Sequence, residues 1–149
     1  MRYLPIAVGL LLAWSFSSAT ASTPERARAA VSQAGSVEKL LAAMSSNTAK
    51  SAGQMIDAQT QLTGAASVGK TMVHYLVLVN YERQDIPNIA EFRAKVASTL
   101  SKSVCTAPIA STLINEYGAE YKYIAYSKSR AFLFEYAFNK TTCSSTYRW

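Results

Sequence analysis

The residue types that build most metal and catalytic sites are scarce in this chain. It has one histidine, two cysteines and two aspartates among 149 residues. Zinc sites need clustered histidine and cysteine ligands, and a serine–histidine–aspartate triad needs a histidine beside both partners. Six glycines and four prolines exclude collagen-like and low-complexity chains. We therefore predict no catalytic residue, no cofactor and no metal site.

The overall composition is that of a globular protein of one domain. Half of the residues are apolar and 16% are charged, which excludes a chain that stays disordered throughout. Fifteen lysines and arginines against nine acids give a net charge of +6, and this weakly favours acidic partners. The length suits a single domain, since domains cluster near 100–150 residues.

The first 21 residues have the order of a secretory signal peptide. Arg2 supplies positive charge, residues 4–14 are apolar, and Ala19 and Ala21 occupy the small-residue positions of a cleavage site. Such an apolar stretch spans about 16 Å as a helix, against ~30 Å of membrane hydrocarbon. No cysteine follows it that could carry a lipid. We expect a mature chain of residues 22–149 that is periplasmic or secreted and meets the membrane only through its signal peptide.

The two cysteines fit an oxidising compartment. An even count in an exported chain indicates a disulfide, here between Cys105 and Cys143. No Cys-x-x-Cys pattern is present, so a structural bond is favoured over a redox pair. Loss of Arg2 with the signal peptide leaves 14 − 9 = +5 as the charge of the mature chain.

Helical patterns occupy the start and the middle of the mature chain. Residues 22–52 predict two helices, with Gly35 as the break and Ser36 as the second N-cap. Residues 86–104 carry apolar side chains at spacings of three and four, which is typical of an amphipathic helix. A short helix then opens at Pro108 and ends at Gly118.

The first predicted hairpin joins residues 55–66 to residues 70–80 through a turn at Val68-Gly69. This register puts Leu62 opposite Tyr75 and makes the core face from the following residues: Val73, Tyr75, Val77 and Val79. The opposite face of the second strand then presents another set: Met72, His74, Leu76 and Leu78. Two leucines are costly to leave exposed, so we expect this second set to form a partner surface.

The second predicted hairpin joins residues 119–126 to residues 131–139 through a turn at Lys128-Ser129. In this register Tyr121 lies opposite Tyr136, and the aromatic face is the natural core face. Helices on one side of such an antiparallel sheet make a two-layer α+β domain. We thus expect one domain, with a helical part at 22–52 and a hairpin–helix–hairpin core at 55–149.

Three local patterns resemble chemical sites and favour plainer interpretations. Residues 64–71 match the phosphate-loop pattern G-x-x-x-x-G-K-T, but the most strand-like run of the chain follows where a helix is needed, so we predict a hairpin turn. His74 has no acid or nucleophile placed beside it by local geometry. Aromatic side chains between residues 117 and 138 could stack bases, but the export signal and dispersed cations argue against a nucleic-acid partner.

A set of short segments resembles a loose group of small exported bacterial proteins of uncharacterised function. The segments are Asp57-x-x-Thr60-x-Leu62 before a tyrosine-bearing strand, His74-Tyr75 within that strand, Tyr121-x-Tyr123, and the two cysteines bracketing a helix and hairpin. The resemblance covers roughly residues 45–145. It implies fold and location and no activity. The group usually has a proline before the aspartate, where this chain has Gln54.

We therefore expect a small exported, non-enzymatic interaction protein whose partner is another protein. An inhibitor or immunity-type protein and an accessory of an envelope machine both fit this design. Two alternatives remain open: a small hydrolase of an envelope polymer, which needs paired acids or His74 beside a nucleophile, and a ligand carrier that uses the aromatic face as a pocket.

Overall fold

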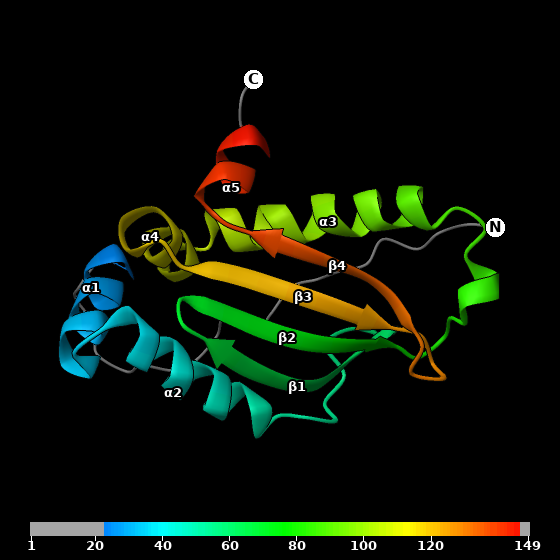
Figure 1. Ribbon diagram of the computed structural model, residues 1–149, viewed down its shortest axis with the longest axis horizontal. Helices are drawn as coiled ribbons and strands as arrows, with labels where there is room; N and C mark the ends of the chain where they lie inside the picture. Colours follow the sequence, from blue (N-terminus) through cyan, green and yellow to red (C-terminus); the bar gives the residue numbers. More distant parts are fainter. Residues whose placement is uncertain (1–22, 147–149) are drawn as a thin grey trace.

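The computed structural model describes residues 23–146, so the predicted signal peptide, residues 1–21, lies outside the described part of the chain. Helices and hairpins alternate along the chain, as predicted for an α+β domain (Figure 1). The elements are α1 (Thr23–Ala34), α2 (Val37–Ala49), β1 (Thr60–Val68), β2 (Thr71–Leu78), the 3-10 helix η1 (Arg83–Asp85), α3 (Ile89–Thr106), α4 (Pro108–Tyr117), β3 (Glu120–Tyr126), β4 (Phe132–Phe138) and α5 (Lys140–Thr146).

The four strands form one sheet in the order β1-β2-β3-β4, which confirms that both hairpins share a sheet. Each hairpin is antiparallel, but β2 and β3 pair in parallel, with Thr71 opposite Glu120 and Val77 opposite Tyr126. Parallel neighbours need a long crossover, and α3 and α4 supply it. The sequence pattern did not predict this central pairing.

The first hairpin turns one residue later than predicted. Val68 pairs with Thr71, so the turn is Gly69-Lys70, with Gly69 at φ +56°. A left-handed residue suits the tight turns of hairpins, and glycine adopts it without a steric cost. The segment that matches the phosphate-loop pattern is therefore a β-hairpin, as expected, and the ammonium group of Lys70 donates to the carbonyl of Tyr117 (3.0 Å).

The new turn alone would keep the predicted faces, because it shifts the pairing by two residues; a β-bulge between Leu62 and Gly64 then shifts it by one and exchanges the faces at Leu62. Leu62 pairs with Leu76 rather than with Tyr75. Because strand side chains alternate, a shift of one residue sends each one to the opposite face. The predicted core face on Val73 and Tyr75 is therefore wrong, and the side of the sheet that carries Met72 and Leu76 meets the helices instead.

The second hairpin differs from the prediction by two residues. Tyr121 pairs with Phe138, and Tyr123 with Tyr136, because the loop is longer than a two-residue turn and includes Arg130 at φ +68°. An even shift leaves every side chain on its expected face. The aromatic face is indeed core: Tyr121, Tyr123 and Phe138 are buried.

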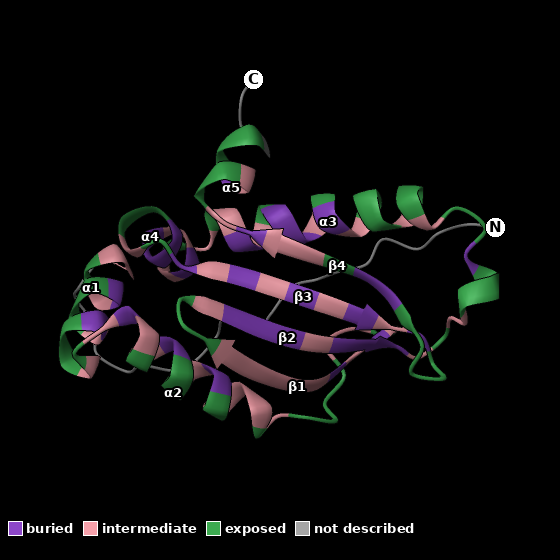
Figure 2. Cartoon of the chain, viewed as in Figure 1, coloured by how far each residue is buried: buried purple, intermediate pink, exposed green. Residues whose placement is uncertain are grey.

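One helical layer covers one face of the sheet. α2 packs along β1 and α3 along β4, at the two edges of the sheet (Figure 1). The main apolar cluster joins Leu41 of α2 and Leu113 of α4 to Leu62, Leu76 and other residues on the same side of the strands. The buried segments in Figure 2 accordingly concentrate in β2, β3 and α4.

Local signals explain the helix ends. Gly35, at φ +88°, separates α1 from α2, and the Ser36 hydroxyl accepts the Lys39 N–H as the N-cap of α2, as the sequence predicted. Gly118 ends α4 in the left-handed conformation. Arg28 of α1 forms a bidentate ion pair with Glu116 of α4, at 2.6 and 2.8 Å, which fixes the helix pair at this end of the sheet.

The predicted disulfide between Cys105 and Cys143 is confirmed, with an S–S distance of 2.03 Å. It joins the last turn of α3 to α5, the short helix that follows β4. The Cys143 side chain is buried in the main apolar cluster. The bond therefore fixes the chain end to the crossover helix.

Candidate functional site

The predicted partner surface lies inside the domain. Met72, His74, Leu76 and Leu78 are only 2%, 6%, 6% and 4% exposed. Met72 and Leu76 belong to the apolar cluster that α2, α3 and α4 complete. The prediction of a docking surface on these side chains is therefore wrong, because it depended on a register without the bulge between Leu62 and Gly64 and so assigned them to the face opposite Leu62.

His74 lies in an aromatic stack and not beside a catalytic partner. Its ring stacks on Tyr123 with centroids 4.8 Å apart and interplanar angle 10°, and Tyr121 continues the stack at 6.4 Å. Burial lowers the pKa of His74 to about 4, and a hydrogen bond to the backbone of Lys122 only partly opposes this. The imidazole is thus neutral at ordinary pH, with Nδ1 unpaired.

The aromatic face is packed rather than open to a ligand. Burial raises the pKa of the Tyr121 and Tyr123 hydroxyls well above the usual range for tyrosine. Tyr123 meets Phe138 edge-on at 5.9 Å beneath the helical layer. Within residues 23–146 these rings fill the core, so the proposed ligand pocket on this face is not supported.

The aspartate motif of the resemblance has a structural role. One carboxylate oxygen of Asp57 accepts the N–H groups of Gln59 and Thr60 at 2.7 and 2.8 Å, which closes the turn into β1. Thr60 and Leu62 are then buried at 6% and 1%. The motif therefore fixes the start of the sheet.

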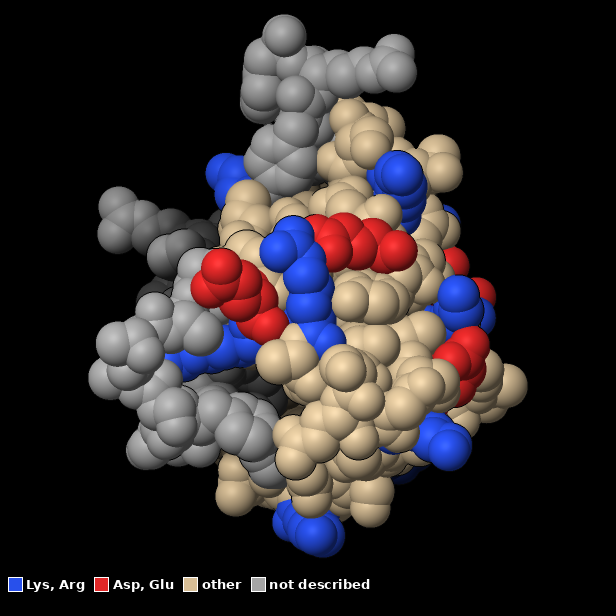
Figure 3. All heavy atoms as spheres, turned by 90° about the vertical axis from the view of Figure 1, so that its left-hand side faces the viewer, with Lys and Arg blue, Asp and Glu red and all other residues tan. Residues whose placement is uncertain are grey.

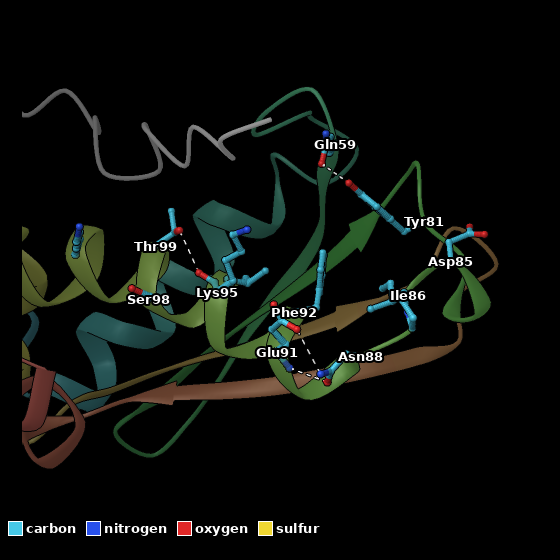
Figure 4. A pocket seen from close by; sticks show the side chains of 13 residues that line it. Gln59, Tyr81, Asp85, Ile86, Asn88, Glu91, Phe92, Lys95, Ser98 and Thr99 are labelled. Carbon is cyan, nitrogen blue, oxygen red and sulfur yellow. Dashed lines mark hydrogen bonds between the residues drawn. The ribbon is translucent and has the colours of Figure 1, made fainter. Parts of the chain in front are cut away.

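A groove runs between α3, from Glu91 to Lys102, and the segments before β1 and after β2. Its volume is about 520 Å³, and Figure 4 shows the side chains that line it. Half-buried or buried apolar groups contribute its inner wall: Tyr81, Ile86, Phe92 and Val96. Clefts of this size that combine apolar walls with a few polar groups are the usual binding sites of proteins.

Local interactions hold the wall of the groove in place. The Tyr81 hydroxyl donates to the side-chain amide oxygen of Gln59 (3.1 Å), which links the end of β2 to the segment before β1 (Figure 4). The Tyr81 ring contacts Phe92 at 5.6 Å, and Phe92 meets Phe134 edge-on at 6.0 Å. Asn88 begins α3 by accepting the Glu91 N–H. The apolar wall is therefore anchored to the sheet.

The charges along the groove are separated by sign. Asp85 and Glu91 line the end near the start of α3, while Lys95 and Lys102 line the part further along the helix. Positions 91, 95, 98 and 102 recur at the helical spacing, so they share one face of α3. A segment that carries cations at one end and anions at the other would match this order.

Sequence reasoning did not single out this groove. The spacing predicts an amphipathic helix over residues 86–104, but Phe92 and Val96 on its apolar stripe are only half-buried. The local signal was the Asn88 cap after Pro87, which begins α3, but the groove forms only where α3 meets the segments that carry Gln59 and Tyr81.

Other classes of site find little support in residues 23–146. No group of three or more histidine, cysteine or acidic side chains there could hold a metal ion. No helix in this part is long and apolar enough to cross a membrane. Lysines and arginines are interspersed with acids over the end that carries α1 and α4, so no single-sign field appears on this end (Figure 3).

Comparisons with known proteins identify the fold. No family model and no curated protein matches the sequence. A candidate secreted protein from Pseudomonas aeruginosa has a similar solved structure, with 18% identity, a TM-score of 0.61, and 72% and 92% of the two chains covered.

Two further similar structures are pilotins of type II secretion systems. EpsS from Vibrio vulnificus is 10% identical with a TM-score of 0.57, and the match covers 78% of this chain and 96% of that one. AspS from Vibrio cholerae is 17% identical with a TM-score of 0.54, and the match covers 72% and 92%. At these identities the likeness shows a shared fold.

Proposed function

We propose that this chain is an exported accessory protein of an envelope machine, which acts by binding a segment of another protein in the α3 groove. The groove itself carries the proposal: it combines an anchored apolar wall with charged residues ordered along one helix. The fold shared with pilotins of type II secretion systems favours the envelope-machine accessory over the inhibitor or immunity-type protein.

The chemistry of the groove describes the segment it would accept. Tyr81 and Phe92 offer ring faces to apolar side chains, as anchors at the centre of an interface usually do. Lys95 and Lys102 favour acidic residues at one end, and Asp85 and Glu91 favour basic residues at the other. An amphipathic helix of two or three turns presents such a pattern on one face.

Photo-crosslinking in living cells tests this binding. A photoreactive amino acid replaces Ser98 or Lys102, both exposed residues that line the groove, and in a control it replaces Ala94, which is exposed on α3 outside the groove. We expect the two groove positions to crosslink one segment of one envelope protein, identified by mass spectrometry. Equal crosslinking from position 94, or scattered products from all three, would contradict the proposal.

Charge reversal then measures the interaction. With the crosslinked segment as a labelled peptide, Lys95→Glu combined with Lys102→Glu should weaken binding roughly tenfold, since two rim charges contribute about 1–1.5 kcal/mol together. The control Lys39→Glu, on the exposed side of α2, should leave the affinity unchanged. An unchanged affinity in the double variant would exclude the groove as the binding site.

A further inference from the structure

The face of the sheet opposite α2, α3 and α4 is apolar, and no helix of the described residues packs on it. Register and alternation place Val73, Tyr75 and Val77 of β2 on it, beside Ile124 and Tyr126 of β3. Neither of the apolar clusters to which the helices contribute includes Val73 or Val77. The centre of this face, the open face, is a row of aliphatic and tyrosine side chains in which Val73 and Val77 are 8% and 3% exposed and the other three are half-buried.

The strongly exposed large apolar side chains of residues 23–146 all lie on this face. Met55 is 48% exposed and bridges to Gln61, the register partner of Val77. Val68 is 76% exposed and ends β1. Phe132 is 57% exposed and meets the Tyr126 ring edge-on at 6.3 Å. Apolar groups therefore extend to the rim of the face, which is unusual unless a partner covers it.

One ion pair lies on the open face between β3 and the edge strand β4. Lys122 and Glu135 lie 3.0 Å apart, with side chains 30% and 49% exposed. In a two-fold symmetric dimer, if residue i of the first copy contacts residue j of the second, then residue j of the first copy also contacts residue i of the second. In a dimer formed by two such faces, Lys122 of each copy could therefore pair with Glu135 of the other. The charges of the face are in this sense self-complementary.

The size of the face also suits a second copy. Four strands spaced ~4.8 Å apart and seven residues long at ~3.3 Å per residue cover roughly 19 by 23 Å, or about 440 Å² in projection. Surface relief and the rim side chains add accessible area to this value. Stable interfaces bury about 800 Å² per partner, so the face falls at the small end of that class.

We propose that two copies of this chain associate through their open sheet faces. Sheets that pack in this way align within about 30° and interdigitate their side chains. The contact covers the half-buried members of the row and the exposed Val68 and Phe132, and it exchanges the Lys122–Glu135 pair between copies. It leaves the α3 groove on the other side of the sheet accessible, so it does not depend on the proposed function.

Sedimentation velocity on the exported protein, with its disulfide intact, tests the association. Up to a concentration of about 1 mM the mass should double, because a small apolar interface corresponds to micromolar affinity. Phe132→Glu should weaken association at least tenfold, and Ala43→Glu on the exposed side of α2 should leave it unchanged. A wild-type protein that stays monomeric throughout, or equal loss in both variants, overturns the proposal.

Exchange of charges provides a second, independent test. Lys122→Glu places four acids at the contact of two identical copies, and Glu135→Lys places four lysines there. We expect each variant alone to be monomeric and an equal mixture of the two to form heterodimers. Circular dichroism melts confirm that both fold. A mixture that remains monomeric, although wild type dimerises, overturns the proposed pairing of the two faces.

Discussion

Acidification should destabilise this protein through His74. The folded pKa is about 4, and the ordinary value is 6.5, because the buried ring cannot be solvated as a cation. Between these pH values the unfolded chain binds a proton that the native chain does not. The contribution of neutral His74 to the free energy of unfolding is therefore complete above pH 6.5 and is lost as the pH falls toward 4.

The magnitude follows from the two pKa values. A pKa difference of 2.5 units corresponds to a loss of about 3.4 kcal/mol in the free energy of unfolding once His74 is protonated in both the folded and the unfolded chain. About 2 kcal/mol of this is already lost at pH 5. That is a large share of the 5–15 kcal/mol typical of native proteins. Few single groups in the described residues should affect acid stability so strongly.

Urea unfolding followed by circular dichroism at pH 7 and pH 5 measures this effect. His74→Phe serves as the control, because a phenyl ring can stack on Tyr123 but cannot titrate. Glu82 and Glu116, whose pKa values their hydrogen-bonding partners lower, contribute equally in both proteins. Between pH 7 and pH 5, we expect the free energy of unfolding of the wild type to fall by about 2 kcal/mol more than that of the variant. Parallel losses would refute the burial argument.

Three further stability changes follow from the structure, each measurable by urea or thermal unfolding. Reduction of the Cys105–Cys143 bond should cost about 4 kcal/mol, since it opens a loop with a sequence separation of 38; a loss below 1 kcal/mol would contradict the loop-closure account. Gly118→Ala should cost about 1–2 kcal/mol from the backbone at φ +70° alone, because no atom lies within 4 Å of an added methyl, and Gly118→Asn should cost less. Leu41→Ala should cost 2–5 kcal/mol, because the side chain is fully buried; a smaller loss would mean that the core collapses around the gap.

The helices and the disulfide could be predicted because their signals are local. Gly35, Ser36 and Gly118 each determine a helix end by backbone conformation or by a capping hydroxyl. The cysteine count in an exported chain was enough to pair Cys105 with Cys143. The α+β class followed from the order of these elements.

The faces of β2 could not be predicted because the strand lacks alternation. Apolar side chains occupy both sides, so Met72 and Val73 are equally suited to a core, and both are buried. The bulge in β1 decides which of them shares a face with Leu62, because it shifts the register by one residue between Leu62 and Gly64. The supposed partner surface followed from a register without this bulge, and the groove required tertiary contacts that no local pattern contains.

The parallel pairing of β2 with β3 determines when this protein can become native. Each hairpin closes from neighbouring residues in microseconds, but the two halves meet only across residues 79–119. That long closure costs entropy before any contact compensates for it, so it is the slow step that we expect in folding. Cys105 belongs to the crossover and Cys143 to the chain end. The bond closes a loop that contains β3 and β4, and the route from β2 to β3 through it is about as long as the direct one, so an oxidising compartment should stabilise the folded product without much change in the rate of this closure.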